Sequence, residues 1–203
     1  MRSLWVTDRE TCGDERFHVL LETLAGCPDL SVELREKALG DADYLALARS
    51  ARAALGPGVP LCVNRRLDIA LAAGADGVHL PSDGLPVTRV RANTPRGFSV
   101  GVSVHSPEEA AAAIDDGADL VVIGPIFDTP SKRAFGPPLG PQGLDRLPLL
   151  SGHSAAVYAI GGIAEENLGE IARRAGRVSG VAGIRYFQDA ADPRAAVAKV
   201  SRL

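Results

Sequence analysis

Polar side chains follow two apolar runs in the middle of the chain, where strands of an α/β fold would end. They are Ser103, His105, Thr129, Ser131 and Lys132. Imidazole changes its protonation state near neutral pH, so His105 is the strongest candidate for a general acid or base. On residue type alone, a structural role for His105 carries equal weight. His79 also ends an apolar run, and for it we favour the structural role.

Two cationic side chains could bind an anion. Arg35 and Lys37 stand directly after the apolar run 30–34, and they would supply both positive charge and hydrogen-bond donors. A solvated charge cluster is the ordinary alternative. The position at a strand end favours the anion site.

Glycines and a turn near the end of the chain predict a phosphate site. Gly161 and Gly162 follow the apolar run 156–160, and Ile184 and Arg185 follow the run 180–184. Backbone N–H groups approach a phosphate closely at glycine, and barrels often bind phosphate after their seventh and eighth strands. A tight turn that needs glycine is the weaker alternative. We therefore predict a phosphate cradle from these four residues.

Metal and cofactor signals are weak. Carboxylates are sparse at the strand ends, the candidates being Asp128, Asp83 and Glu36. Mg²⁺ requires several oxygen ligands, so no two-carboxylate magnesium site is predicted. The three cysteines lack Cys-x-x-Cys spacing, which argues against a zinc site and fits a reducing cytoplasm. No Gly-x-Gly-x-x-Gly follows the first strand, so a dinucleotide site has no support.

Alternating strands and helices must position these residues. The predicted strands are 4–7, 30–34, 61–64, 77–80, 99–106, 120–124, 156–160 and 180–184. Helices are predicted at 17–25, 42–55, 67–73, 106–117 and 195–200, the fourth with Ser106 and Glu109 at capping-box spacing. A helix-glycine-strand phrase recurs at 73–78, 116–121 and 175–181. We predict a (βα)8 TIM barrel forming one domain over 1–203, with an open doubly wound sheet as the alternative.

The composition and charge limit the classes of binding partner that we expect. The 203 residues are 46% hydrophobic and 23% charged, and a formal net charge of −3 leaves no basic excess for nucleic acid. No apolar run approaches the roughly 18 residues that cross a bilayer. We expect a soluble cytoplasmic protein with a small-molecule ligand and no membrane or nucleic-acid partner, and a homo-oligomer is compatible with this. The Gly- and Pro-rich segment 134–143 is either a connector or a lid.

Six phrases, together and in order, resemble the thiamine phosphate synthase/TenI superfamily along nearly the whole chain. They are VELREK at 32–37, VNRRLDIA at 63–70, GADGVHL at 74–80, GVSVHS at 101–106, GPIFDTPSK at 124–132 and AIGGI at 159–163. The resemblance implies a (βα)8 barrel, a thiazole phosphate ligand and a role in thiamine biosynthesis. The substrate-binding residues it implies are Arg35, Lys37, Asn64, Ser82, Ser103, Thr129, Ser131 and Lys132.

Departures from the pattern separate two branches of the superfamily. The synthase branch, which couples a pyrimidine pyrophosphate to a thiazole phosphate, uses Mg²⁺ and has aspartates where this chain has Arg65 and Gly84, and a glutamine in place of Glu33. The thiazole tautomerase branch resembles this chain in Leu-Pro-Ser at 80–82 and in the Ser-Val-His-Ser phrase, whose catalytic histidine maps to His105. The small residues usual after the eighth strand are replaced by Arg185 and Tyr186.

We therefore expect a tautomerase that aromatises a carboxythiazole phosphate by proton transfer through His105, without a metal or cofactor. The alternatives are a thiamine phosphate synthase, which would need Mg²⁺, and a non-catalytic thiazole phosphate-binding regulator.

Overall fold

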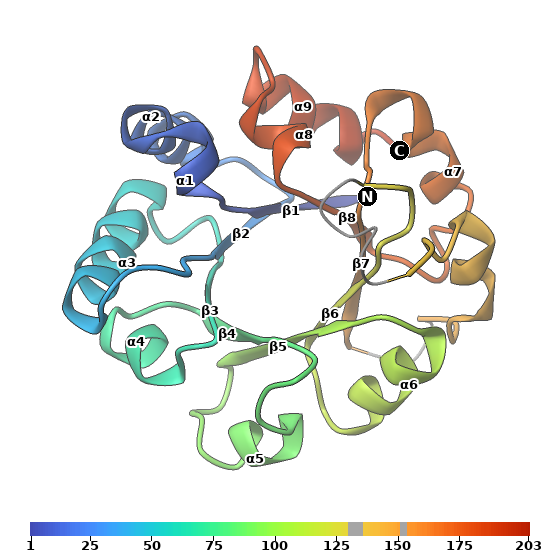
Figure 1. Cartoon of the computed structure of the whole chain (residues 1–203), viewed down its shortest axis with the longest axis horizontal. Helices are drawn as coiled ribbons and strands as arrows, with labels where there is room; N and C mark the ends of the chain where they lie inside the picture. The colour runs from blue at the N-terminus through green and yellow to red at the C-terminus, as the bar shows by residue number, and fades with distance from the viewer. Residues whose placement is uncertain (130–135, 151–153) are drawn as a thin grey trace.

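The computed structural model describes residues 1–129, 136–150 and 154–203, and within them eight parallel strands close into a barrel (Figure 1). They are β1 Arg2–Val6, β2 Leu30–Leu34, β3 Leu61–Asn64, β4 Gly77–Leu80, β5 Ser99–Val104, β6 Leu120–Ile123, β7 Ala156–Ile160 and β8 Gly180–Gly183. Each strand pairs with its neighbours in sequence, and β8 returns to β1. The closed order confirms the predicted TIM barrel and excludes the open doubly wound sheet.

Helices form the outer ring around the strands, as Figure 1 shows. They are α1 Arg9–Cys12, α2 Asp14–Leu24, α3 Asp41–Leu55, α4 Leu67–Ala72, α5 Val87–Arg91, α6 Pro107–Asp115, α7 Leu168–Ala172, α8 Arg185–Gln188 and α9 Pro193–Ser201, with 3₁₀ helices η2 Pro141–Arg146 and η3 Glu165–Asn167. The predicted strands are confirmed within about two residues. No helix in the described ranges is long and apolar enough to cross a membrane.

The main core lies between the barrel and its helices. Helix side chains such as Phe17 and Leu21 pack there with Val32, Val78 and Val121 from the strands. Successive side chains of a strand point to opposite faces. The residues between these outward-facing positions therefore point into the barrel.

The barrel interior is divided into an apolar half and a polar half. A separate buried cluster contains strand residues only: Leu4, Val6, Leu120, Val122, Tyr158 and Ala182. It fills the side made by β6, β7, β8 and β1. The side made by β2 to β5 carries Glu33, Asn64, His79 and Ser103.

The start of α6 fixes the backbone at the end of β5. The Ser106 side chain accepts a hydrogen bond from the Glu109 N–H at 3.1 Å, and Pro107 occupies the first turn. The Glu109 carboxylate reaches back one residue further than a capping box requires, and it accepts from the His105 N–H at 2.7 Å. The helix start therefore holds the peptide of the candidate catalytic histidine.

Part of the segment 134–143, interpreted from the sequence as either a connector or a lid, is anchored. Residues 134 and 135 of the segment 134–143 lie outside the described residues, whereas η2 begins at Pro141. The N–H groups of Leu139 and Gly140 donate to the carbonyls of Pro125 and Ile126 at 2.9 and 3.0 Å. These bonds tie the described middle of the segment to the chain that follows β6, as in a connector.

Candidate functional site

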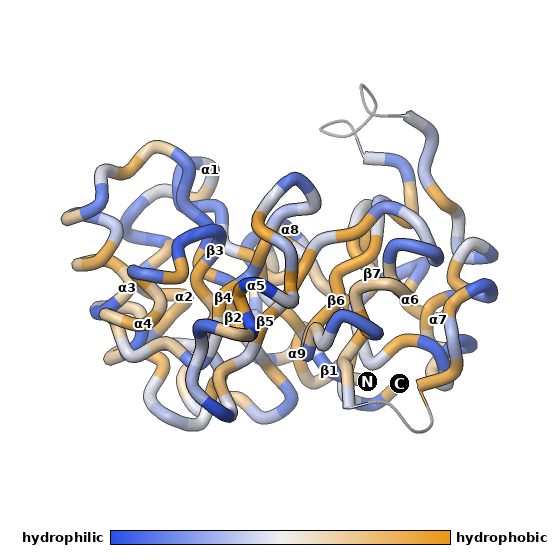
Figure 2. Tube along the Cα trace, turned by 90° about the horizontal axis from the view of Figure 1, so that it is seen from below, coloured by the Kyte–Doolittle hydropathy of each residue, from blue (hydrophilic) through white to orange (hydrophobic). Residues whose placement is uncertain are grey.

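The candidate residues that the structure describes lie at or just beyond the carboxyl ends of the strands. Figure 2 shows the barrel from the side, with α1 and the chain after β6 along its upper edge and both chain ends along its lower edge. The upper edge is the mouth where barrels place their ligands. In the tube, hydrophilic segments are frequent along this edge.

His105 is exposed at this mouth with its ring oriented by one strong contact. Its Nδ1 lies 2.9 Å from the Gly124 carbonyl oxygen, and its Nε2 lies 3.5 Å from the Ser82 hydroxyl. A carbonyl can only accept, so Nδ1 carries the hydrogen and Nε2 keeps its lone pair. The side chain is therefore a base whose reactive nitrogen is defined by the fold.

Asn64 and Ser103 are linked through two residues that were not predicted as site residues. The Asn64 amide donates to Glu33 Oε1 at 2.9 Å, and His79 Nε2 lies 2.9 Å from Ser103 Oγ. Glu33 and His79 are both buried. The partner at Nε2 is consistent with the structural role favoured for His79. Glu33 could have been found from its place between two outward-facing apolar residues of one strand.

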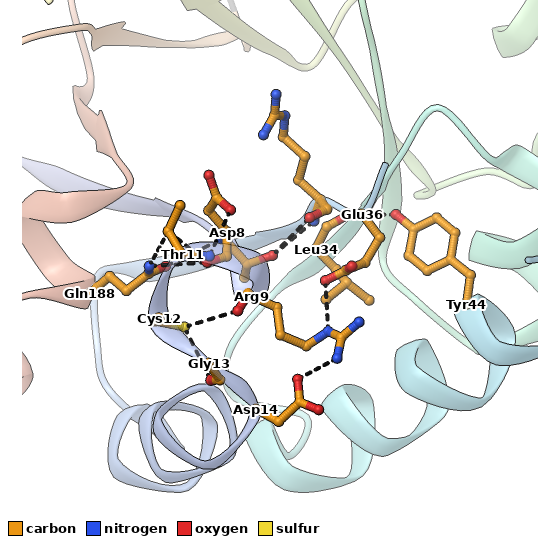
Figure 3. Close-up of polar contacts among 12 residues, drawn as sticks. Asp8, Arg9, Thr11, Cys12, Gly13, Asp14, Leu34, Glu36, Tyr44 and Gln188 are labelled. Atoms are coloured by element: carbon orange, nitrogen blue, oxygen red, sulfur yellow. Dashed lines mark hydrogen bonds and ion pairs between the residues drawn. The ribbon is translucent and has the colours of Figure 1, made fainter. Parts of the chain in front are cut away.

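The anion candidates Arg35 and Lys37 lie in the segment after β2. Thr7 Oγ1 accepts from the Arg35 N–H at 2.9 Å, while the Lys37 side chain is exposed. Figure 3 shows the neighbouring contacts, in which Arg9 pairs with Glu36 and the Tyr44 hydroxyl donates to the Leu34 carbonyl. Glu36 is thereby engaged by a cation.

Gln188 joins the last turn of α8 to the segment after β1. Its amide nitrogen donates to the Asp8 carbonyl at 3.1 Å and to Thr11 Oγ1 at 3.0 Å, and its amide oxygen accepts from the Asp8 N–H at 3.2 Å (Figure 3). Ile184 and Arg185 begin this short helix, Ile184 half-buried and Arg185 exposed. The hydrogen bonds of Gln188 therefore hold α8, whose first residues form one side of the predicted phosphate site.

Gly161 and Gly162 are required by packing as well as by any ligand. Both have left-handed φ values, +100° and +64°. A Cβ at Gly161 would lie 2.6 Å from Pro125 Cβ, and one at Gly162 would lie 2.7 Å from the Asp128 carbonyl oxygen. This close approach accounts for both glycines without an anion, so the phosphate cradle stays a prediction.

Tyr186 packs inward beside that predicted cradle. Its ring makes an edge contact with Phe187, with ring centroids 4.9 Å apart, and burial raises the pKa of its hydroxyl. The bulky residue after β8 is therefore accommodated by packing.

The residues at the positions where the synthase branch has metal ligands do not fit Mg²⁺. The Arg65 guanidinium lies 3.1 Å from the Asp83 carboxylate, both side chains are exposed, and Gly84 contributes no side chain. A hard divalent cation needs several free oxygen ligands, whereas this pair offers one carboxylate and a competing cation. The next residue, Arg66, is engaged elsewhere, and its guanidinium lowers the pKa of Asp68 to about 2.

The structure brings one group of predicted residues together and leaves others apart from it. Direct contacts join Ser82 to His105, and Asn64 and Ser103 to the Glu33–His79 pair. The backbone N–H of Arg35 is bonded instead to Thr7, the residue after β1. Thr129 is half-buried, and Ser131 and Lys132 lie outside the described residues.

Comparisons with known proteins agree on the family. The profile of the thiamine monophosphate synthase family (TMP-TENI) matches residues 4–187. A putative thiamine-phosphate synthase of Geobacter sulfurreducens is 41% identical over 191 residues, covering 93% of this chain and 87% of that protein. The thiamine-phosphate synthase of Methanoregula boonei is 40% identical over 171 residues, covering 83% of this chain and 78% of that protein.

A solved structure gives the same answer. The thiamine phosphate pyrophosphorylase of Pyrococcus furiosus superposes with a TM-score of 0.82 at 27% identity, covering 99% of this chain and 94% of that one. The names of these three proteins support the synthase alternative, and none of them supports the tautomerase expectation. The chain belongs to the thiamine monophosphate synthase/TenI family.

Proposed function

We propose that this barrel binds a thiazole phosphate at its mouth and isomerises a carboxythiazole phosphate by proton transfer through His105. The observation that carries the proposal is the orientation of His105. Its Nδ1 hydrogen is held by the Gly124 carbonyl, and its Nε2 lone pair is left at an exposed position of the mouth. A base with a defined tautomer and solvent access is the main requirement for this chemistry.

The reaction moves one proton within the substrate. His105 Nε2 takes a proton from the ring carbon, and the electrons of that C–H bond shift toward the exocyclic double bond. The same nitrogen then returns the proton to the exocyclic carbon, which leaves an aromatic ring and a neutral histidine. Between the two steps the imidazolium is stabilised by its hydrogen bond to the Gly124 carbonyl.

Anionic groups of the substrate would be held by side chains and backbone around the mouth. Arg35 and Lys37 supply cations after β2, and Arg65 supplies an exposed guanidinium after β3. In this proposal the phosphate lies at Gly161 and Gly162, next to the start of α8. These groups bind and orient the substrate, while His105 moves the proton.

Thiamine phosphate synthesis is the second candidate, and the names of relatives up to 41% identical favour it. In that reaction Mg²⁺ would hold the leaving pyrophosphate. Arg65 and Gly84 argue against it, since neither can replace a carboxylate ligand.

One incubation experiment separates the candidates. The protein is mixed with the dihydrothiazole carboxylate phosphate, with and without the pyrimidine pyrophosphate and Mg²⁺, and products are separated by chromatography. Isomerisation without Mg²⁺ supports the proposal, whereas coupling that depends on Mg²⁺ supports the synthase. Binding of the thiazole phosphate with neither product identifies a regulator.

A further inference from the structure

A buried carboxylate and a buried imidazole lie side by side inside the polar half of the barrel. Glu33 on β2 is 3% exposed and His79 on β4 is 1% exposed. Glu33 Oε2 lies 3.7 Å from His79 Nδ1, and on the other side of the ring His79 Nε2 lies 2.9 Å from Ser103 Oγ. Carboxylate, imidazole and hydroxyl thus follow one another across β2, β4 and β5.

His79 Nδ1 is a buried polar atom that lies near the Glu33 carboxylate. Nδ1 has no hydrogen-bond partner within the described residues, although it is buried. A buried ring nitrogen without a hydrogen-bond partner lowers the stability of the fold. The Glu33 carboxylate, 3.7 Å from Nδ1, can accept a hydrogen bond from it after a small shift. Gly101 leaves the space for this ring, because a Cβ there would lie 2.7 Å from Nδ1.

The hydrogen bond from Asn64 defines what Glu33 can do. Asn64 donates its amide hydrogen to Oε1 at 2.9 Å and leaves Oε2 toward His79. An ionised carboxylate only accepts. Opposite a carboxylate of this kind, Nδ1 is the ring nitrogen that carries a hydrogen.

We infer that Glu33 holds the proton of a neutral His79 on Nδ1, so that Nε2 accepts the Ser103 hydroxyl hydrogen. With its own hydrogen directed at His79, the half-buried Ser103 oxygen presents lone pairs to the mouth. Ser103 then recognises a ligand atom that gives a hydrogen, such as an amine, an N–H, a hydroxyl or an acidic C–H. Glu33 acts through His79 and is a positioning residue.

The substitution Glu33→Gln would reverse this chain of bonds. The oxygen of the new amide could still accept from Asn64, but its NH₂ group would donate to His79 Nδ1. The ring hydrogen would then move to Nε2 and be donated to Ser103 Oγ. The Ser103 hydroxyl would turn its hydrogen to the mouth and would recognise acceptors instead of donors.

Nitrogen-15 NMR of the histidine side chains tests this directly. The ring nitrogens of His79 are assigned by comparison with a His79→Asn variant and are read from long-range proton–nitrogen spectra near neutral pH. We expect a protonated Nδ1 and an unprotonated Nε2 in the unchanged protein. A hydrogen on Nε2, alone or together with one on Nδ1, would overturn the inference.

Two variants sharpen the measurement. Glu33→Gln should move the hydrogen from Nδ1 to Nε2. Glu22→Gln removes the same charge at an exposed position of α2 and should leave the His79 hydrogen on Nδ1. An unchanged His79 spectrum in a folded Glu33→Gln protein would contradict the inference. If Glu33→Gln fails to fold, Ser103→Ala takes its place, and it should shift Nε2 toward the value of an unbonded imidazole nitrogen while Nδ1 stays protonated.

The readout is a resonance and does not require turnover. It therefore succeeds or fails independently of whether the barrel isomerises a thiazole or couples two substrates.

Discussion

Replacing His105 by asparagine would remove one ring nitrogen and little else. In asparagine the amide nitrogen occupies the place of Nδ1, so the hydrogen bond to the Gly124 carbonyl can be kept. Nothing replaces Nε2, whose only hydrogen-bond approach within the described residues is the 3.5 Å one to Ser82. The change therefore isolates the proton-transfer atom from the atom that positions the ring.

The expected effect on rate is much larger than the effect on stability. Loss of a general acid–base typically slows a reaction about 10²–10⁴-fold, which corresponds to about 3–5 kcal/mol of barrier. At most one net hydrogen bond is at risk, worth about 1 kcal/mol, so the melting temperature should fall by no more than about 2–4 °C.

Single-turnover isomerisation with deuterium on the ring carbon measures this rate, and calorimetry measures the melting temperature. His18→Asn, the same change at an exposed position of α2, is the matched control and should leave the rate unchanged. A folded His105→Asn protein that isomerises the substrate at the unchanged rate would remove this histidine from the mechanism.

Three further outcomes are expected. Isomerisation should survive a chelator, and a strict metal requirement in the unchanged protein would contradict the site described above. Gly101→Ala should destabilise the barrel by about 1–3 kcal/mol in denaturant unfolding, because its Cβ would press on His79; unchanged stability would mean that the ring has room to move. Burial raises the pKa of Cys62 to about 12, so this thiol stays protonated at mildly alkaline pH and should react with a disulfide reagent only on unfolding; fast reaction in the native protein would show that the interior opens.

The barrel could be predicted from the sequence because its strands are short, apolar and separated by clear helix signals. Ser106, Pro107 and Glu109 marked the start of α6 correctly, since capping is a local interaction. The short α1, α5, α7 and α8 were not predicted. Helices of four or five residues are too brief to show a hydrophobic period, and tertiary contacts stabilise them.

The candidate site was predictable only where single residues point to chemistry. His105 stood out by its type and its place at a strand end. The pairing of Glu33 with His79 depends on which strands are neighbours and on the direction of each side chain, and a linear sequence specifies neither. The close packing of Gly162 against Phe127 is likewise a contact between distant segments. From the sequence alone, Gly162 could therefore be interpreted equally well as a residue that binds a ligand.

Glu109 will matter to anyone who scans this chain by mutation. Its carboxylate receives the His105 N–H, and its own N–H donates to the Ser106 hydroxyl that begins α6. An alanine at this exposed helix position would ordinarily be tolerated, yet here it would release the peptide that carries the proposed base. Loss of activity at position 109 should therefore be interpreted as a loosened support, even though its effect in a screen would resemble that of a residue that touches the substrate.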